Sequence, residues 1–157
     1  MTFPNGCHVC EVEVDPATGA VEVVRYSIVE DIGTVLNPTL AHGQLQGGVA
    51  QGLAQALGEA IAIDPGSGQL LTGSFMDYVM PRADDLPFIA IEMREVPTKA
   101  NPLGAKGVGE AGTVGSLSAV INAVCDALGP LGVKHIEMPL TPARVWAAIQ
   151  EAKAGKA

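Results

Sequence analysis

Basic residues are scarce in this sequence. Its 157 residues include 9 Lys and Arg against 17 Asp and Glu, which gives a formal net charge of −8. A protein that binds nucleic acid presents a basic stripe or patch, and this chain has none, so we expect no nucleic-acid partner. Long apolar runs are missing as well. Because a membrane-spanning helix needs about 18 or more consecutive apolar residues, we expect no membrane span.

Cysteine is equally rare. The chain has 3 cysteines, an odd number that argues against a closed disulfide framework and favours a reducing compartment. The opening residues, "MTFPNGCHVC", lack the basic and apolar regions of a secretory signal. We therefore expect a cytoplasmic protein.

Apolar residues, in contrast, make up 48% of the chain, and charged residues only 17%. This composition is typical of a globular domain, and the length suffices for one hydrophobic core. We expect a single domain over residues 1–152, followed by a flexible tail over 153–157. The low charge suggests that another chain or domain covers part of the surface.

Alternating patterns predict the strands. Residues 10–14 alternate between apolar and acidic side chains, which is typical of a half-buried strand. The turn-forming "DPATG" follows at 15–19, so residues 20–29 should return as the second strand of a hairpin. We expect a short strand around 69–71 and another over 87–96.

Three segments have helical character. Residues 39–61 carry an apolar side chain at every fourth position. A last helix, to about residue 152, should begin with Thr141 as its N-cap and Pro142 at its first position. Between them, a helix should present these side chains inward: Val114, Leu117, Val120, Ile121, Val124 and Leu128. The expected fold class is α+β, a mixed sheet of a few strands packed with two or three helices.

The first predicted helix contains glycines at 43, 47, 48 and 52. Each weakens a helix by about 1 kcal/mol relative to alanine. Glycines at this spacing allow close packing against a sheet, or the approach of another backbone or a ligand. The residues alone leave both interpretations open.

The stretch "NPLGAKGVGEAG" at 101–112 is the richest in glycine. It is not a phosphate loop, because Lys106 precedes Gly107 and Gly109 instead of following the last glycine. It is not a dinucleotide fingerprint either, because no apolar strand precedes "GVGEAG". A third interpretation is a loop that lets Glu110 reach a bulky cofactor and act as a general base. The simpler alternative is a glutamate in the first turn of a helix, interacting with the helix dipole.

The "CHVC" at 7–10 raises the question of a zinc site. Cys125, His42 and His135 could be imagined as further ligands. In an extended strand, however, positions 7 and 10 face opposite sides, and no second paired motif is present. We therefore predict core cysteines and no metal site formed by side chains.

Two motifs taken together resemble a known family. "GQLQGGVAQGLAQALGEA", followed some fifty residues later by "TKANPLGAKGVGEAGTVGSLSAVINAV", resembles the C-terminal end of the molybdopterin-binding large subunit of the molybdenum hydroxylases. These enzymes include xanthine dehydrogenase, aldehyde oxidase and aerobic carbon monoxide dehydrogenase. "NGCHVCEVEVDPATGAVEVVRYSIVEDIGTVLNP" is similar to the stretch that leads into this region. The resemblance covers nearly the whole chain.

The resemblance implies a role for several residues. Glu110 matches the catalytic glutamate of the family, which removes a proton at the molybdenum centre. Gln44 matches the glutamine that hydrogen-bonds the pterin. The loop beside the cofactor is matched by Lys106, Gly107, Val108 and Gly109. The domain would then be part of the larger molybdopterin-binding domain, and Glu110 would serve the oxidation of an aldehyde, an N-heterocycle or carbon monoxide.

The family's large subunits are several times longer than this chain, and most of their cofactor contacts lie upstream. The resemblance therefore implies a C-terminal portion, either a separately encoded piece or a fragment, that is inactive alone. Its expected partners are the upstream part of the large subunit, an iron–sulfur subunit carrying 2Fe-2S, and an FAD subunit. The pterin form stays open, although a cytosine dinucleotide is common in bacterial-looking relatives.

Two other functions compete with this one, a non-catalytic remnant or assembly domain and a small zinc-binding module. If the chain is part of a larger subunit, we expect an apolar docking surface. It should lie around the glycine-rich helix and residues 97–112.

Overall fold

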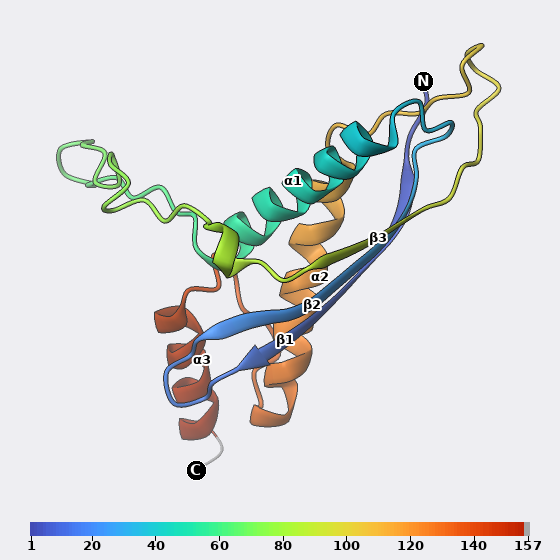
Figure 1. The fold of residues 1–157 in the computed structure, drawn as a ribbon. Coiled ribbons are helices and arrows are strands. Elements are labelled where there is room, and N and C mark those ends of the chain that lie inside the picture. The colour runs from blue at the N-terminus through green and yellow to red at the C-terminus, as the bar shows by residue number, and fades with distance from the viewer. Residues whose placement is uncertain (156–157) are drawn as a thin grey trace.

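The computed structural model describes residues 1–155, and a long hairpin begins the chain (Figure 1). Strand β1 covers Asn5–Val14, and β2 returns antiparallel to it as Val21–Asp31. The predicted turn joins them, and the Asp15 carboxylate accepts hydrogen bonds from the Ala17 backbone and the Thr18 hydroxyl. The hairpin was therefore predicted correctly, although both strands are longer than the pattern indicated.

A β-bulge changes which side of β2 faces the interior. Val12 pairs with Val23, but Glu11 pairs with Arg25, so Val24 has no partner in the register. One extra residue reverses the side-chain alternation beyond it. Tyr26, Ile28 and Glu30 therefore all point inward and are buried.

A third strand completes the sheet. β3, Ile89–Met93, runs parallel to β2, and the strand order is β1-β2-β3. It is shorter than the predicted strand over 87–96. The predicted strand near 69–71 is wrong, since that segment contributes only an isolated bridge between Ile63 and Leu70. The mixed sheet with three α-helices confirms the α+β class.

Helix α1, Pro38–Leu57, lies against the inner face of the sheet (Figure 1). Asn37 caps it, because its side-chain oxygen accepts a hydrogen bond from the Leu40 amide at 3.1 Å. The helix ends four residues earlier than predicted, at Gly58, and Ile61 is 65% exposed. Three side chains of the predicted stripe are buried together with side chains of β2 and β3, in a cluster that we call the upper core: Leu45, Val49 and Leu53. Leu57, the last residue of the helix, is partly buried against this cluster.

Helix α2, Ala111–Leu128, crosses α1 closely and also packs on β1. Its buried side is formed by Gly112, Ser116, Val120, Val124 and Leu128. The prediction that Val114 faces inward is wrong: it is 69% exposed, because the contact with α1 selects the Gly112–Ser116 side.

The segment 111–131, which comprises α2 and the following short turn of 3₁₀ helix, has a mean hydropathy of 1.4. By length and composition it could cross a membrane. A core helix passes the same test, and α2 packs against α1 and β1. A single helix of this kind is weak support for a membrane span.

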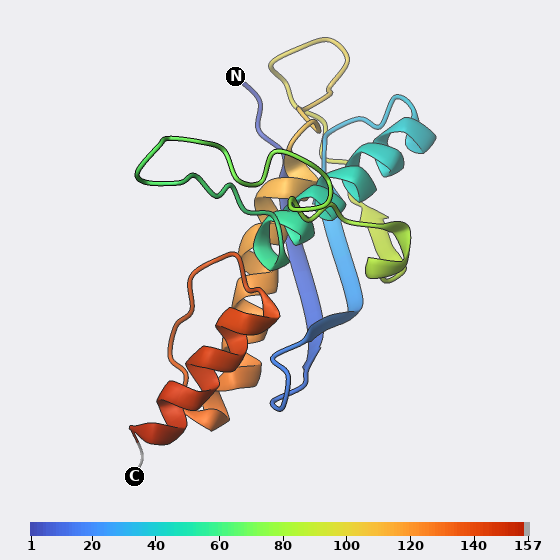
Figure 2. The ribbon, with the colours of Figure 1, turned by 90° about the vertical axis from the view of Figure 1, so that its left-hand side faces the viewer.

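The last helix, α3, covers Pro142–Ala154 and packs beside the lower half of α2 (Figure 2). Thr141 caps it as predicted, accepting a hydrogen bond from the Arg144 amide at 3.4 Å. The helix runs two residues beyond its predicted end, into the segment predicted to be a flexible tail. The remainder of that tail, 156–157, lies outside the described residues.

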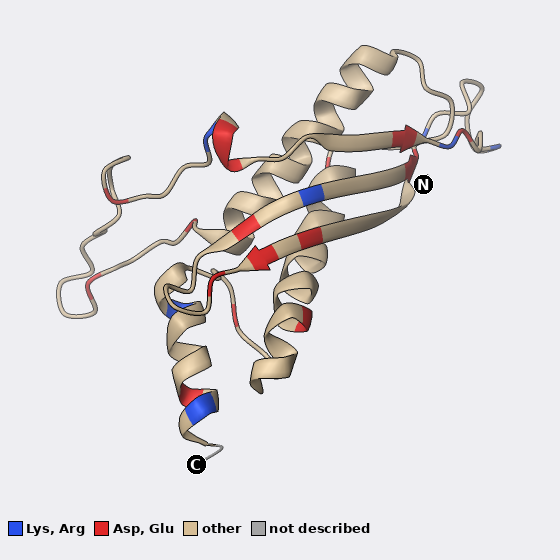
Figure 3. Cartoon of the chain, turned by 60° about the horizontal axis from the view of Figure 1, so that its bottom comes forward, with Lys and Arg blue, Asp and Glu red and all other residues tan. Residues whose placement is uncertain are grey.

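An extended arm, residues 58–88, projects from the body of the molecule (Figures 1 and 2). Most of its large apolar side chains are exposed, among them Phe75 at 78% and Met76 at 92%, whereas Leu86 is partly buried against the core. Only a short 3₁₀ turn, Ala83–Asp85, interrupts it. Lys and Arg are scattered singly over the described part of the chain and form no stripe (Figure 3).

Candidate active site

The glycine-rich loop before α2 is anchored to the end of the hairpin. Gly33 and Gly104 have φ values of +70° and +69°, in the left-handed region that favours glycine. Ala105 forms a bridge with Gly33, and the Lys106 amide donates to the Ile32 carbonyl at 2.8 Å. The loop is therefore fixed to β2 immediately before the candidate residues.

A largely buried ion pair between Lys106 and Asp31 also holds the loop to the end of β2. Lys106 Nζ donates to the Asp31 carboxylate, and only 12% and 14% of the two side chains are exposed. Burial pushes the pKa of Asp31 upward, but hydrogen bonds from Lys106 and from the Gly33 and Val96 amides outweigh it. The pKa of Asp31 is therefore lower than its usual value. The ammonium of Lys106 is thus engaged by the protein itself.

Two of the predicted residues meet directly. Gln44, on α1, donates through Nε2 to the carbonyl of Gly109 at 2.7 Å, although 65 positions separate them in sequence. Val108 takes the opposite direction and packs against the upper core. Any ligand beside this loop would therefore meet backbone at 107–109, and not the Val108 side chain.

Glu110 is the N-cap residue of α2. Its side chain makes no capping hydrogen bond with the first turn, and the residue is exposed. Glu110 therefore does not cap the helix through its side chain, while its place at the helix N-terminus is compatible with the simpler alternative, an interaction with the helix dipole. The carboxylate lies at the rim of a hollow of about 580 Å³, between the first residues of the chain, the end of β2 and the start of α2.

The glycines predicted to allow close approach fall into two groups. At Gly48 and Gly52 a Cβ would collide with α2, so these two allow helix-to-helix packing and not the packing against the sheet that the sequence suggested. At four other positions no other part of the described chain lies within 4 Å of where a Cβ would stand: Gly43, Gly47, Gly107 and Gly109. Nothing in the fold requires glycine there, and bare backbone faces open space.

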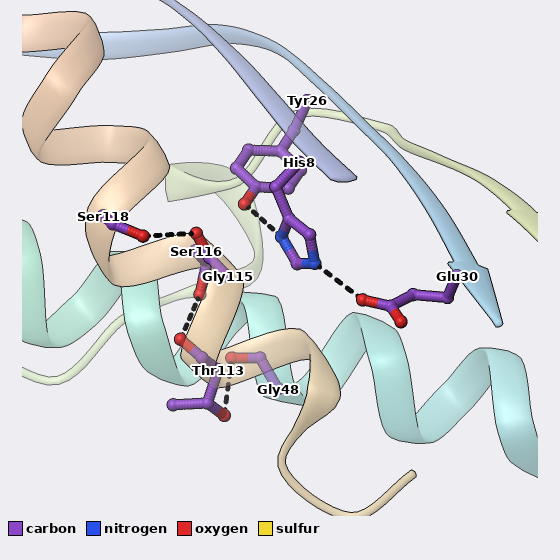
Figure 4. A network of polar contacts seen from close by, with 8 residues as sticks. All are labelled: His8, Tyr26, Glu30, Gly48, Thr113, Gly115, Ser116 and Ser118. Carbon is purple, nitrogen blue, oxygen red and sulfur yellow. Dashed lines mark hydrogen bonds and ion pairs between the residues drawn. The ribbon is translucent and has the colours of Figure 1, made fainter. Parts of the chain in front are cut away.

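A buried polar cluster that was not predicted from the sequence contributes His8 and Glu30 to the lining of the same hollow. His8 Nε2 and Glu30 Oε1 are 3.0 Å apart, and His8 Nδ1 lies 2.7 Å from the Tyr26 hydroxyl (Figure 4). Only 5% of the His8 side chain and 4% of the Glu30 side chain are exposed. Burial, with the nearby charges of Cys10 and Glu30, raises the pKa of Tyr26. The bulge in β2 turns Tyr26 and Glu30 inward, and no pattern in the sequence indicates where the bulge lies.

Cys7 and Cys10 lie on opposite sides of β1, as the strand geometry predicts, but the prediction of core cysteines is wrong for Cys7, which is exposed, while Cys10 and Cys125 are only partly buried. Cys7 is exposed on the outer side of β1, and Cys10 is half-buried on the inner side. Burial raises the pKa of the Cys10 thiol to about 11, so it is not a thiolate at neutral pH. Within residues 1–155 no three His, Cys, Asp or Glu side chains lie close enough to hold a metal ion.

Comparison with known proteins gives one family. The model of the molybdopterin cofactor-binding domain family matches residues 1–87. The chain is 39% identical to the carbon monoxide dehydrogenase large chain of Hydrogenophaga pseudoflava, over 96% of this chain and 19% of that protein. It is 45% identical to the nicotine 6-hydroxylase large subunit of Paenarthrobacter nicotinovorans, over 91% of this chain and 17% of that protein.

Solved structures agree in fold. A reconstituted carbon monoxide dehydrogenase from Oligotropha carboxidovorans superposes with a TM-score of 0.91 at 35% identity, covering 97% of this chain and 19% of that one. Quinoline 2-oxidoreductase from Pseudomonas putida 86 gives 0.89 at 41% identity, covering 94% and 19%. The chain thus spans about a fifth of the length of the proteins that it matches.

Proposed function

The chain belongs to the molybdopterin-binding large-subunit family of the molybdenum hydroxylases, and from this premise we propose that it supplies a catalytic base and one wall of the cofactor pocket. The base is Glu110. The observation that carries the proposal is its position: an exposed carboxylate at the start of α2 that does not cap its own helix. A general base needs a carboxylate that is available in this way.

The residues around Glu110 suit a large planar cofactor. Gly43 and Gly47 on α1, with Gly107 and Gly109 on the loop, leave backbone bare where side chains would block approach. Gln44 already lies at this place, and its amide oxygen can accept a hydrogen bond while Nε2 donates to Gly109. Since Lys106 is paired with Asp31, we assign its part of the loop a contact through backbone and not through the ammonium.

When bound, the molybdenum cofactor supplies the two-electron oxidation and the oxygen that reaches the substrate. This chain contributes position and proton transfer. Glu110 accepts the proton released as the substrate carbon is attacked and returns it to solvent afterwards. The Gln44–Gly109 hydrogen bond fixes the loop one residue before Glu110, and the Lys106–Asp31 pair fixes it four residues before Glu110. Two anchors so close to Glu110 limit how far its carboxylate can move. The rate of catalysis falls steeply when a catalytic group is displaced, so these anchors support the proposed role.

The complete enzyme extends beyond these residues. We propose that the remainder of a large subunit closes the pocket, and that iron–sulfur (2Fe-2S) and FAD subunits carry the electrons away. The cytosine dinucleotide form of the pterin and a cytoplasmic location belong to the same proposal. The substrate is a small molecule: an aldehyde, an N-heterocycle or carbon monoxide. Relatives named for carbon monoxide and for nicotine support this range without choosing within it.

One observation favours the alternative of an assembly domain. The exposed apolar side chains of the arm, such as Phe75 and Met76, are what a docking element would present. A domain can both dock and take part in catalysis. The assembly-domain alternative therefore differs from our proposal only in whether Glu110 acts as a general base. The zinc module is disfavoured because Cys7 and Cys10 face opposite sides of β1.

The test replaces Glu110→Gln in the assembled enzyme. Molybdenum content should stay near that of the wild type, because the glutamine keeps the size of the side chain. Turnover should fall by about 10²- to 10⁴-fold, the usual contribution of a general base. Glu151→Gln, an exposed glutamate on α3, is the matched control and should retain full activity. Activity of the Glu110 variant within a few-fold of wild type would show that the domain is not catalytic through this residue.

A further inference from the structure

The hollow beside Glu110 is lined mostly by apolar residues and glycines, together with two acidic residues. Its walls are largely apolar, with Phe3, Pro4 and Val114 among the lining residues. Two acidic residues, Glu30 and Glu110, also line it, and no Lys or Arg among residues 1–155 does. A pocket of about 580 Å³ with apolar walls and a few polar groups is typical of small-molecule sites.

Glu30 is the unusual member of this lining. Its Oε1 accepts a hydrogen bond from His8, but its Oε2 is buried without any hydrogen-bond partner in residues 1–155. Figure 4 shows this second oxygen turned away from the imidazole. A buried acceptor that lacks a donor is unfavourable, and more so when it carries charge. The oxygen therefore calls for a donor that the cluster itself does not supply.

The neighbours of Glu30 cannot provide that donor. Whichever tautomer the imidazole adopts, His8 Nε2 is directed at Oε1 and His8 Nδ1 at the Tyr26 hydroxyl. Both ring nitrogens are thereby used. The ion pair of Lys106 with Asp31 likewise occupies the nearest ammonium of the loop.

Two glycines hold the cluster in place. A Cβ at Gly6, opposite Glu30 in the sheet, would lie 2.3 Å from Glu30 Oε1. A Cβ at Gly115, on α2, would lie 2.5 Å from the His8 ring. The carboxylate and the imidazole thus fill spaces that glycine alone leaves free.

We propose that this hollow binds a small organic molecule whose apolar body carries an ammonium or another N–H donor, with the donor bonded to Glu30 Oε2. The apolar walls hold the body, and the two carboxylates attract the nitrogen and repel anions. The inference deepens the proposed function, and rests on it for the claim that the bound molecule is the substrate of Glu110. Binding itself requires no turnover.

The experiment titrates the chain with three probes of one ring by calorimetry: benzylammonium, benzyl alcohol and benzoate. Benzylammonium should bind roughly tenfold or more tightly than benzyl alcohol, because a charge-assisted hydrogen bond replaces a neutral one. Benzoate should bind more weakly than both. Equal affinity for all three probes, or a preference for benzoate, would overturn the proposal.

A variant series assigns the preference to Glu30. Glu30→Gln keeps a hydrogen-bonding group of the same shape beside His8 but removes the charge, so the preference for benzylammonium should fall to within about threefold. Glu13→Gln, an exposed glutamate on β1 away from the hollow, is the matched control and should bind like the wild type. An unchanged preference in Glu30→Gln would remove Glu30 from the site. If that variant fails to fold, the order of the three probes on the wild type still decides.

The two proposals fail separately. If Glu110→Gln retains activity in the assembled enzyme while wild-type chain prefers benzylammonium, the catalytic role is wrong and the binding site stands. If that variant loses turnover while the wild type shows no preference among probes, the binding site is wrong and the catalytic role stands.

Discussion

Among single residues, Asp31 has the clearest effect on how the loop before Glu110 is held. It ends β2, accepts from Lys106 Nζ, and receives the Gly33 and Val96 amides at 2.8 and 3.2 Å. One carboxylate thus ties the end of β2 to two points of the chain that lie 65 and 75 residues further on. Its lowered pKa means that folding favours the ionised form.

This gives a prediction for stability against pH. Because the native pKa of Asp31 lies below its ordinary value of 3.8, its contribution is fully present above that pH and is lost as the pH falls through the native pKa. Asp31→Asn should lower the free energy of unfolding at pH 7, and the difference from wild type should shrink below about pH 4. Urea unfolding across this range measures it. Asp126→Asn, which removes an exposed aspartate on α2, is the control and should change the free energy of unfolding at pH 7 less than Asp31→Asn does.

Single residues also show where the sequence stops being informative. Gln44 and Glu110 could be assigned to one site because their motifs resemble those of a family, and the structure does bring their segments together at Gly109. The roles assigned to them remain proposals. His8 and Glu30 could not be found, because one unpaired residue, Val24, decides that Glu30 points inward. A bulge leaves no mark in a pattern of alternating valines.

Of the elements, α1 depends on its glycines in two different ways. At Gly52 a Cβ would lie 1.9 Å from Ser116 Oγ and 3.1 Å from the Thr113 carbonyl, so the backbones of α1 and α2 touch there. The Thr113 hydroxyl strengthens this contact by donating to the Gly48 carbonyl at 3.1 Å. Gly47 lies one position from that contact and faces nothing within 4 Å. The same residue type therefore serves packing at one place and an open surface at the next.

A matched pair of alanine variants separates the two uses. Gly52→Ala should lower the free energy of unfolding by about 1–3 kcal/mol, because the helices must move apart. Gly47→Ala should raise it by up to about 1 kcal/mol, since alanine favours the helix and meets no obstacle. In the assembled enzyme, however, Gly47→Ala should lower the molybdenum content. A more stable chain with normal molybdenum content would mean that no cofactor approaches α1 at Gly47.

The elements themselves were largely predictable. Local sequence patterns predict the hairpin, the cap at Thr141 and the presence of α2, because tertiary contacts do not alter the structure of these segments. The errors occur where tertiary contacts decide. Val114 lies outside the buried side because the crossing with α1 rotates α2, and α1 ends at Gly58 because the chain leaves the body there as the arm. Neither cause can be read from helical periodicity.

For the molecule as a whole, the main question is what covers the arm. We predicted an apolar docking surface around the glycine-rich helix and residues 97–112. The helix and the loop do expose Leu40 and Leu103, but nine of the 21 large apolar side chains described as exposed lie in the arm, including Phe75 and Met76. An arm held by few contacts of its own gains order from what it docks onto. The remainder of a large subunit, which the matched proteins have, is the proposed partner.

The arm predicts how the chain behaves alone. Expressed without the remainder of a large subunit, it should self-associate at micromolar concentrations, bind no molybdopterin tightly and show no hydroxylase activity. Replacing Phe75→Ser and Met76→Ser together should reduce self-association in sedimentation velocity and leave the free energy of unfolding nearly unchanged, because both side chains are already exposed. Leu103→Ser in the loop is the matched control and should have the smaller effect.

In the assembled enzyme the same double variant, Phe75→Ser with Met76→Ser, should impair assembly, so that molybdenum content and activity fall together. A chain that is monomeric alone, or an assembly that tolerates the double variant, would mean that the arm is not the docking element. Full activity of the isolated chain would mean that its pocket needs no other wall.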